Sequence, residues 1–262
     1  AYPLSRLQAG MLFHGQLNPD SAIYCNLSSL HLRIPFDADK MQQAVDTIVA
    51  RHPVLRTSFD LSRWSEPLQL VHQNVKTPLS VTDLRTLESR QCEQAIAEWI
   101  QQQRVRTYDI NAAPLLRFHV HRRTDNEIQF TWCEHHVILD GWSVATMLSE
   151  LIECYLRLLG RRNEPEKPAV AIGYNQFVAL ERKTILDAAV RDYWAKSLQD
   201  VTPTKRPRWK QSNGVDAARR FGNREVAISR AISDGIKLLA QQAGVPVKSA
   251  LLAAHLKVMA AW

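Results

Sequence analysis

The chain has 262 residues, a formal net charge of +7 and a hydrophobic share of 45 %. This composition can form a substantial core, and the length allows one large domain or two small ones. No stretch approaches the ~20 consecutive apolar residues of a membrane span, and the N-terminal residues lack a signal-peptide pattern. The composition therefore argues against a membrane protein.

The four cysteines are widely spaced, and none forms a CxxC pair. This spacing argues against a zinc ribbon or a disulfide framework, and it favours a cytoplasmic chain with reduced thiols. Basic runs occur at 161–163, 205–210 and 218–224. No zinc-finger or RNP-like pattern accompanies them, so we interpret them as solvated loops and expect no nucleic-acid partner.

Alternating apolar residues predict strands in the first half of the chain. The predicted strands are residues 27–34, 68–72, 115–122 and 128–136. Helical periodicity separates them. The predicted helices are residues 38–52, 88–103 and 144–159. Asp37 or Asp39 is a suitable N-cap for the first helix, and Ser143 for the third.

The segment 160–225 is rich in proline and charge and predicts a linker interrupted by two helices, at 174–183 and 188–198. A short strand near 225–228 and helices at 232–243 and 246–262 follow. The last helix is so apolar that it would normally pack inside something. We therefore expect this chain to be part of a larger protein.

The stretch "EHHVILDGWS" at 134–143 carries the candidate chemistry. On a strand, Glu134 and His136 share the apolar, buried face with Trp132, and His135 points the opposite way. Adjacent strand residues cannot easily place both imidazoles on one ion, and further ligands are not evident, so we predict no metal site.

The residues after His136 form a turn that leads into a helix. Asp140 can bond backbone N–H groups or pair with an arginine. Gly141 permits a backbone conformation that other residues resist, and its missing side chain also lets a ligand approach the backbone N–H. A core histidine beside an ordinary turn is the alternative interpretation, and these residues alone leave both open.

Four stretches resemble the condensation domains of nonribosomal peptide synthetases. "HHVILDG" at 135–141 is similar to the HHxxxDG signature, and "RHPVLRTSF" at 51–59 matches RHxxLRTxF. "YPLSRLQAGMLFH" at 2–14 and, more loosely, "YNQFVALE" at 174–181 resemble the opening and fourth motifs. The four occur in the family's order and cover essentially the whole chain.

The resemblance implies an α/β fold with chloramphenicol acetyltransferase-like lobes, each a mixed sheet flanked by helices. We expect an N-terminal lobe over residues 1–165, then a linker and the beginning of a second, similar lobe over 166–262. In the family, a tunnel between the lobes holds the active histidine. Upstream and downstream carrier proteins deliver substrates on 4'-phosphopantetheine arms, no cofactor is bound directly, and adenylation or epimerisation domains are neighbours.

The implied reaction joins an upstream acyl or peptidyl thioester to the amine of a downstream aminoacyl thioester. The resemblance makes His136 the catalytic residue, while Gly141 offers its N–H to the thioester oxygen. Asp140 is expected to form a structural salt bridge with Arg56, and His135 supports the site. An imidazole can accept or relay the amine's proton at neutral pH, or can mainly orient the amine.

Three further residues are candidates for the tunnel wall: Glu134, Trp142 and Ser143. A carboxylate at position 134 could bind an ammonium or raise the histidine's pKa, although a strand-end residue that reaches solvent is the plainer alternative. "GMLFH" at 10–14, Trp132 and "LDGWS" at 139–143 resemble the subclass that accepts a donor ending in a D-residue.

The family's later motifs are absent, so we expect a C-terminally truncated domain with an incomplete tunnel. Three other functions stay open. A condensation-like domain could only recruit partners, although the intact His136, Asp140 and Gly141 count against this. An epimerisation domain shares the histidine motif, but Trp142 and Ser143 argue against it. A stand-alone acyltransferase of the HxxxD class would also fit His136 and Asp140.

Overall fold

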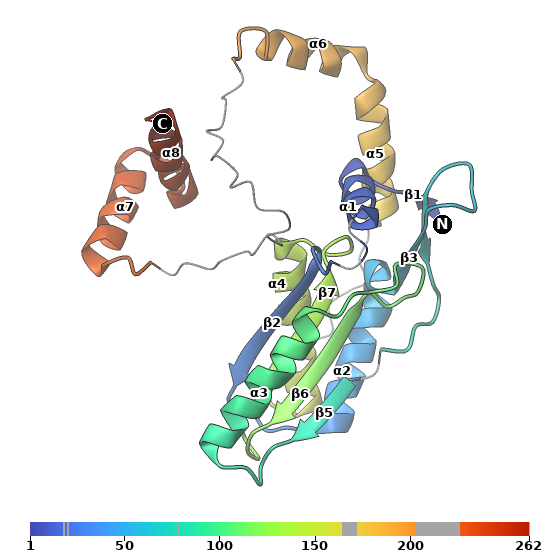
Figure 1. Ribbon diagram of the computed structural model, residues 1–262, viewed down its shortest axis with the longest axis vertical. Helices are drawn as coiled ribbons and strands as arrows, with labels where there is room; N and C mark the ends of the chain where they lie inside the picture. Colours follow the sequence, from blue (N-terminus) through green and yellow to red (C-terminus); the bar gives the residue numbers. More distant parts are fainter. Residues whose placement is uncertain (18, 20, 78, 164–171, 203–225, 262) are drawn as a thin grey trace, which may run out of the picture. The chain divides into compact units, whose positions relative to one another are not determined.

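The computed structural model describes residues 1–17, 19, 21–77, 79–163, 172–202 and 226–261 (Figure 1). The chain forms two compact units, Ala1–Lys196 and Ser197–Trp262. None of the helices in the described ranges is long and apolar enough to cross a membrane. The predicted boundary at residues 165 and 166 lies outside the described residues and stays a prediction.

The first unit alternates short strands and helices along the chain. In its first half, the elements are β1 Tyr2–Pro3, α1 Arg6–Gln16, β2 Cys25–Leu32, α2 Ala38–Arg51, the 3-10 helix η1 Pro53–Arg56, β3 Thr57–Asp60, β4 Leu68–Val71 and β5 Leu79–Asp83. They are followed by α3 Ser89–Arg104, β6 Leu116–Arg122, β7 Ile128–His135, α4 Gly141–Leu158, α5 Tyr174–Leu186 and α6 Ala188–Ser197.

Two sheets organise the first unit. The larger has the strand order β2-β7-β6-β5, in which β5 and β6 are parallel and the other pairs are antiparallel. The smaller has the order β1-β4-β3 and is antiparallel. Strand β7 is thus paired on both edges. This mixed sheet flanked by helices confirms the predicted α/β fold class.

Helices α2 and α4 cover one face of the larger sheet, and α3 lies across the other (Figure 1). Helix α2 buries Met41, Ala44, Val45, Ile48 and Val49, the stripe that its periodicity predicts. Its partners in the core come from the sheet and from α4: Phe118, Val120, Phe130, Trp132, Met147, Leu151 and Tyr155. Each large apolar side chain buried in this way stabilises the fold by about 1.5–3 kcal/mol.

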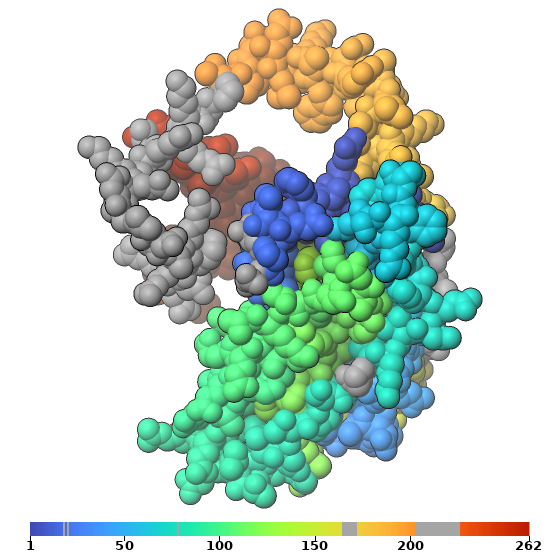
Figure 2. Space-filling view, turned by 45° about the vertical axis from the view of Figure 1, so that its right-hand side comes forward, coloured from blue at the N-terminus to red at the C-terminus, as the bar shows by residue number. Residues whose placement is uncertain are grey.

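The face under α3 is smaller and more polar. Trp99 of α3 stacks on His119 of β6, with ring centroids 4.1 Å apart, and its ring meets the edge of His121 at 5.1 Å. Cys92 and Ile96 of α3 pack with Leu84 in a separate apolar cluster. The rest of α3 is mostly exposed, and the green segment around residue 100 forms an outer surface of this unit in Figure 2.

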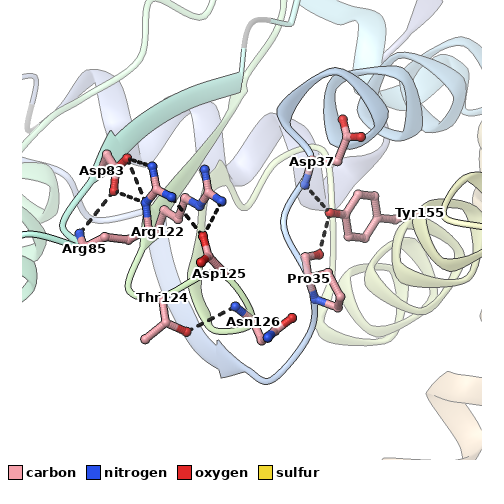
Figure 3. Close-up of polar contacts among 9 residues, drawn as sticks. All are labelled: Pro35, Asp37, Asp83, Arg85, Arg122, Thr124, Asp125, Asn126 and Tyr155. Carbon is pink, nitrogen blue, oxygen red and sulfur yellow. Dashed lines mark hydrogen bonds and ion pairs between the residues drawn. The ribbon is translucent and has the colours of Figure 1, made fainter.

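Polar contacts tie the helix ends to the sheet (Figure 3). The Tyr155 hydroxyl of α4 donates to the Pro35 carbonyl and accepts from the Asp37 N–H, both at 2.8 Å. Asp37 also caps α2, because its carboxylate accepts the Lys40 N–H at 3.0 Å. Elsewhere in the same view, Arg85 bridges Asp83 and Asp125, at 2.7 and 2.8 Å. That cluster is more exposed and contributes little.

Several element predictions need correction. Helix α4 begins at Gly141 and not at residue 144, because Asp140 and not Ser143 is its N-cap. Residues 226–228 form no strand, and Glu225 lies outside the described residues. The short elements β1, β3 and β5 and the helix α1 were not predicted, since two to five residues give little periodicity and α1 mixes polar and apolar positions.

The second unit contains the helices α7 Arg230–Gln242 and α8 Val247–Ala260. They form a hairpin around Gly244, whose φ of 63° lies in the left-handed region that glycine tolerates. The Val245 N–H donates to the Ala240 carbonyl at 3.0 Å and the Gly244 N–H to the Gln241 carbonyl at 3.1 Å. This is a Schellman motif, which ends α7 and turns the chain into α8.

Candidate active site

The candidate site is the junction between β7 and α4. β7 ends at His135, His136 lies in the following turn, and α4 begins at Gly141. The His136 N–H donates to the Tyr24 carbonyl at 2.7 Å, and the Ile138 N–H donates to the His135 carbonyl at 3.1 Å. The turn is therefore anchored to the chain that enters β2, which places His136 at the edge of the packed sheet.

His135 is buried, and its environment keeps it neutral. Its Nδ1 accepts the Val137 N–H at 3.2 Å, and the rings of Tyr24 and Tyr108 lie about its imidazole. Burial first, and the charge of His136 second, lower the pKa of His135 to about 4. These contacts suit the structural support predicted for this residue, with no free nitrogen at Nδ1 for chemistry.

His136 is half-buried, whereas its neighbour His135 is buried. Its Nδ1 lies 3.4 Å from the Asn26 Nδ2 atom of β2. Asn26 had no signal in the sequence beyond being a polar amide in a strand, where asparagine is uncommon. The structure thus adds one neighbour to the predicted site, on the Nδ1 edge of the ring.

Asp140 holds the start of α4. Its Oδ1 atom accepts the Ser143 N–H at 2.8 Å. Hydrogen bonds from Ser143, and to a smaller extent the charge of His136, lower the pKa of Asp140 below its ordinary value. The carboxylate is therefore ionised at neutral pH and belongs to the N-cap of the helix that carries Gly141 and Trp142.

The predicted salt bridge between Asp140 and Arg56 is not present among the contacts of the described residues. The Arg56 guanidinium instead donates to four backbone carbonyls, those of Val49, Ala50, His72 and Gln73. These carbonyls lie at the C-terminal end of α2 and just after β4. Arg56 therefore joins a helix end to the smaller sheet, because its five donors match several carbonyls at once.

Gly141 is the first residue of α4, and one of its two predicted explanations is wrong. Positive φ values occur only at Gly160 and Gly244 within the described ranges, so Gly141 needs no special conformation. A Cβ built at Gly141 would meet no described atom within 4 Å. The packing of the described residues therefore does not require glycine there, and the approach of a ligand to its backbone N–H stays a prediction.

Glu134 does not reach solvent, so the plainer of its two interpretations is wrong. The residue is 2 % exposed, and its Oε2 atom has no hydrogen-bond partner among the described residues. Burial raises the pKa of Glu134 to about 7, against the opposing effect of a hydrogen bond with Asn26. The carboxyl thus changes charge near neutral pH, which is unusual for a glutamate.

Trp142 and Ser143 occupy the first turn of α4. Trp142 is 84 % exposed, and the Ser143 N–H is held by the Asp140 cap. Their place on the tunnel wall stays a prediction. The opening and fourth motifs do meet: the Tyr174 hydroxyl donates to Ser5 Oγ at 3.2 Å, and the Arg6 N–H donates to Glu181 at 3.0 Å. No group of three or more His, Cys, Asp or Glu in the described ranges could hold a metal ion.

Comparison with known proteins decides the family. The condensation-domain profile matches residues 1–262. The chain belongs to the condensation-domain family of nonribosomal peptide synthetases. This condensation domain is 31 % identical over 261 residues to the AMB antimetabolite synthetase AmbE of Pseudomonas aeruginosa, covering 97 % of this chain and 12 % of AmbE. It is 28 % identical over 201 residues to bacitracin synthase 1 of Bacillus licheniformis, covering 76 % of this chain and 4 % of that protein.

Solved structures share the fold. The first condensation domain of the calcium-dependent antibiotic synthetase, in complex with a substrate analogue, has a TM-score of 0.65 and 22 % identity. The match covers 77 % of this chain and 48 % of that one. The starter condensation domain of rhizomide synthetase RzmA has a TM-score of 0.66 and 18 % identity, covering 78 % and 51 %. The condensation domain described here thus spans about half the length of these solved chains and a much smaller share of the related synthetases.

Proposed function

We propose that this condensation domain forms an amide bond between two carrier-bound substrates. An upstream acyl or peptidyl thioester is the donor, and the amine of a downstream aminoacyl thioester is the acceptor. The observation that supports this proposal best is the placement of His136. It is half-buried in the turn between β7 and α4, four residues before the capped start of a helix with open space at Gly141.

The chemistry suits these groups. An α-ammonium has a pKa near ~8 and must lose a proton before its nitrogen attacks the thioester carbon. The His136 imidazole accepts or relays this proton, or orients the amine, and general-base help contributes roughly 10²–10⁴-fold. As the C–N bond forms and the C–S bond breaks, negative charge passes through the thioester oxygen, and the thiol of the donor carrier leaves.

The start of α4 can stabilise negative charge on the thioester oxygen. The first N–H groups of a helix have no partner within the helix, and the N-terminal end is partially positive. Gly141 lies in this first turn with no side chain to block an approach, and Asp140 holds the geometry. A backbone donor aimed at a developing oxyanion contributes roughly 10²–10³-fold. The remaining acceleration comes from positioning two tethered substrates.

The partners in this proposal are an upstream and a downstream peptidyl carrier domain with 4'-phosphopantetheine arms, and adjacent adenylation or epimerisation domains. No cofactor is bound directly. The donor ends in a D-residue, which is supported by Trp132 and by the "LDGWS" stretch that resembles the D-donor subclass. The residues proposed to contribute to the tunnel are Glu134, Trp142 and Ser143. Glu134 is buried and would lie behind the tunnel wall.

The experiment uses the intact synthetase module with both carrier domains loaded. Amide product is followed by intact-protein mass spectrometry for the wild type and for His136→Ala, with donors ending in D- and L-residues. We expect product from the wild type, a preference for the D-donor and a loss of about 10²–10⁴-fold in the variant. A folded wild type that makes no amide with any donor would favour a recruitment domain, or an epimerase if proton exchange at Cα is found instead.

A further inference from the structure

Asn26 and Glu134 form a polar pair beside the His136 turn. The two residues lie directly opposite each other in the antiparallel register of β2 and β7. Opposite side chains share one face of a sheet, with Cβ atoms about 5 Å apart. The Asn26 amide lowers the pKa of the opposite Glu134 carboxyl against the effect of burial, and its Nδ2 atom lies 3.4 Å from His136 Nδ1. One amide therefore contacts both a buried carboxyl and the ring of the candidate catalytic residue.

Burial of the Glu134 carboxyl reduces the stability of the fold. It is buried opposite Leu116 of β6, and its Oε2 atom has no partner within the described part of the chain. The Trp132 Nε1 atom, two residues earlier on the same face, also lacks a partner there. A buried polar atom without a hydrogen bond costs free energy that an apolar side chain of similar size would not. Such departures from good packing concentrate at functional sites.

Burial raises the pKa of Glu134 to about 7, and the ring of His136 is the ionisable group on the other side of the Asn26 amide. Burial raises the pKa of both neighbouring thiols, Cys25 and Cys133, and of the Tyr108 phenol, so all three are neutral at pH 8. His135 is neutral above pH 5. Arg117, which stacks on Tyr108, and Asp140 keep their charges. Apart from the His136 ring, these neighbours keep the same charge between pH 6 and 8. The Glu134 carboxyl is neutral at the lower pH and negative at the higher.

We propose that Asn26 and Glu134 are positioning residues for His136: Asn26 holds the Nδ1 edge of its ring, and the Glu134 carboxylate anchors the Asn26 amide. This inference rests on the proposed function, because His136 is the centre of that reaction. Glu134 does not touch substrate. Its negative charge, placed behind the amide, favours a positive charge on the ring.

The first test compares condensation by the wild type and Glu134→Gln across pH in the intact module. Glutamine has the shape of a protonated glutamic acid and no charge. At pH 6 the two proteins are therefore expected to form amide at rates within about twofold of each other. At pH 8 the variant is expected to be about tenfold slower than the wild type, as for the loss of one hydrogen bond to a charged group. The ratio of the two rates cancels the titration of the substrate amine. A ratio that does not change with pH would overturn the proposal.

A second test needs no condensation activity. Diethyl pyrocarbonate acylates unprotonated imidazole nitrogen, and mass spectrometry of the peptide locates the modification at His136. Asn26→Ala uncovers the Nδ1 edge, so His136 is expected to react about threefold faster at pH 7. Ser29→Ala is the matched control, because it also removes a β2–β7 side-chain hydrogen bond, to Thr131 at 2.6 Å, on the other face. The control is expected to leave the His136 rate unchanged.

The outcomes separate this inference from the proposed function. A wild type that makes no amide contradicts the proposed function, while faster modification of His136 in Asn26→Ala alone still supports the positioning contact. Equal modification in the wild type, Asn26→Ala and Ser29→Ala overturns that contact, whatever the activity. An active wild type with Glu134→Gln equally fast at pH 8 overturns the role of Glu134.

Discussion

Two pairs of histidines, one within β6 and one at the end of β7, differ in burial. His119 and His121 alternate along β6, and both lie on one face, next to Trp99 of α3. Burial lowers the pKa of each to about 4. His135 and His136 are adjacent at the end of β7, so one ring enters the packed interior and the other lies in the turn. The comparison shows that histidines within the strands are buried, whereas the one just after a strand ends is half-buried.

The largest contrast is expected in the rate of condensation. Replacing His136 by alanine removes the imidazole from the turn, and amide formation should fall about 10²–10⁴-fold. Replacing His121 by leucine should leave the rate within about twofold, because His121 faces α3 and not the site. Both rates are measured with loaded carriers in the intact module. A similar loss in the two variants would contradict the distinction between the pairs.

The pH dependence of stability sharpens the same comparison. His119, His121 and His135 have pKa values of about 4 in the folded chain, against 6.5 ordinarily. The unfolded chain therefore binds their protons first, and the stability present above pH 6.5 is lost as the pH falls towards 4. Glu134 acts in the opposite direction, because its raised pKa of about 7 removes stability as the pH rises from 4.5 to 7.

The three histidines outweigh the one glutamate, so the free energy of unfolding should fall by about 2.5 kcal/mol for each pH unit lowered near pH 5. The measurement is urea unfolding of the wild type and of His121→Leu between pH 4.5 and 7. The variant lacks one titrating group, so its slope should be smaller by about 1 kcal/mol per pH unit. An unchanged slope would show that His121 is protonated in the folded state.

A smaller effect tests the start of α4. Asp140→Ala removes the N-cap and should reduce the free energy of unfolding by about 1 kcal/mol, while Asp140→Asn should lose only a few tenths, since asparagine caps helices equally well. A salt bridge with Arg56 would predict similar losses for both variants, because asparagine is uncharged. Chemical denaturation of the three proteins distinguishes the two roles.

The smallest change in stability is expected at Trp142. The side chain is 84 % exposed, so Trp142→Ala should change the free energy of unfolding by less than about 0.5 kcal/mol. If Trp142 contacts substrate, the same variant should slow amide formation at low carrier concentration. Thermal unfolding and the carrier-dependence of the rate are measured on the same preparation. A large loss of stability would place Trp142 in the packing of the fold.

The sequence by itself determined the long elements and the family. The period of 3.6 residues in α2 and the alternation in β6 and β7 are local properties, so they can be predicted without knowing what packs against these elements. Strand alternation placed His136 on the buried face and His135 on the other, and this was wrong: His135 is buried, whereas β7 ends before His136, which is half-buried in the turn. The motifs added His136, Asp140 and Gly141, since these residues follow one another within a single strand, turn and helix.

Only the tertiary structure decided what surrounds these residues. Asn26 lies 110 residues before His136 and approaches it because β2 pairs with β7. Arg56 donates to carbonyls at a helix end, and Glu134 is buried because β7 has a partner on each edge. Burial and hydrogen bonding are set by pairing between distant segments, so the charge states of Glu134 and His135 could not be derived from the residues in sequence alone.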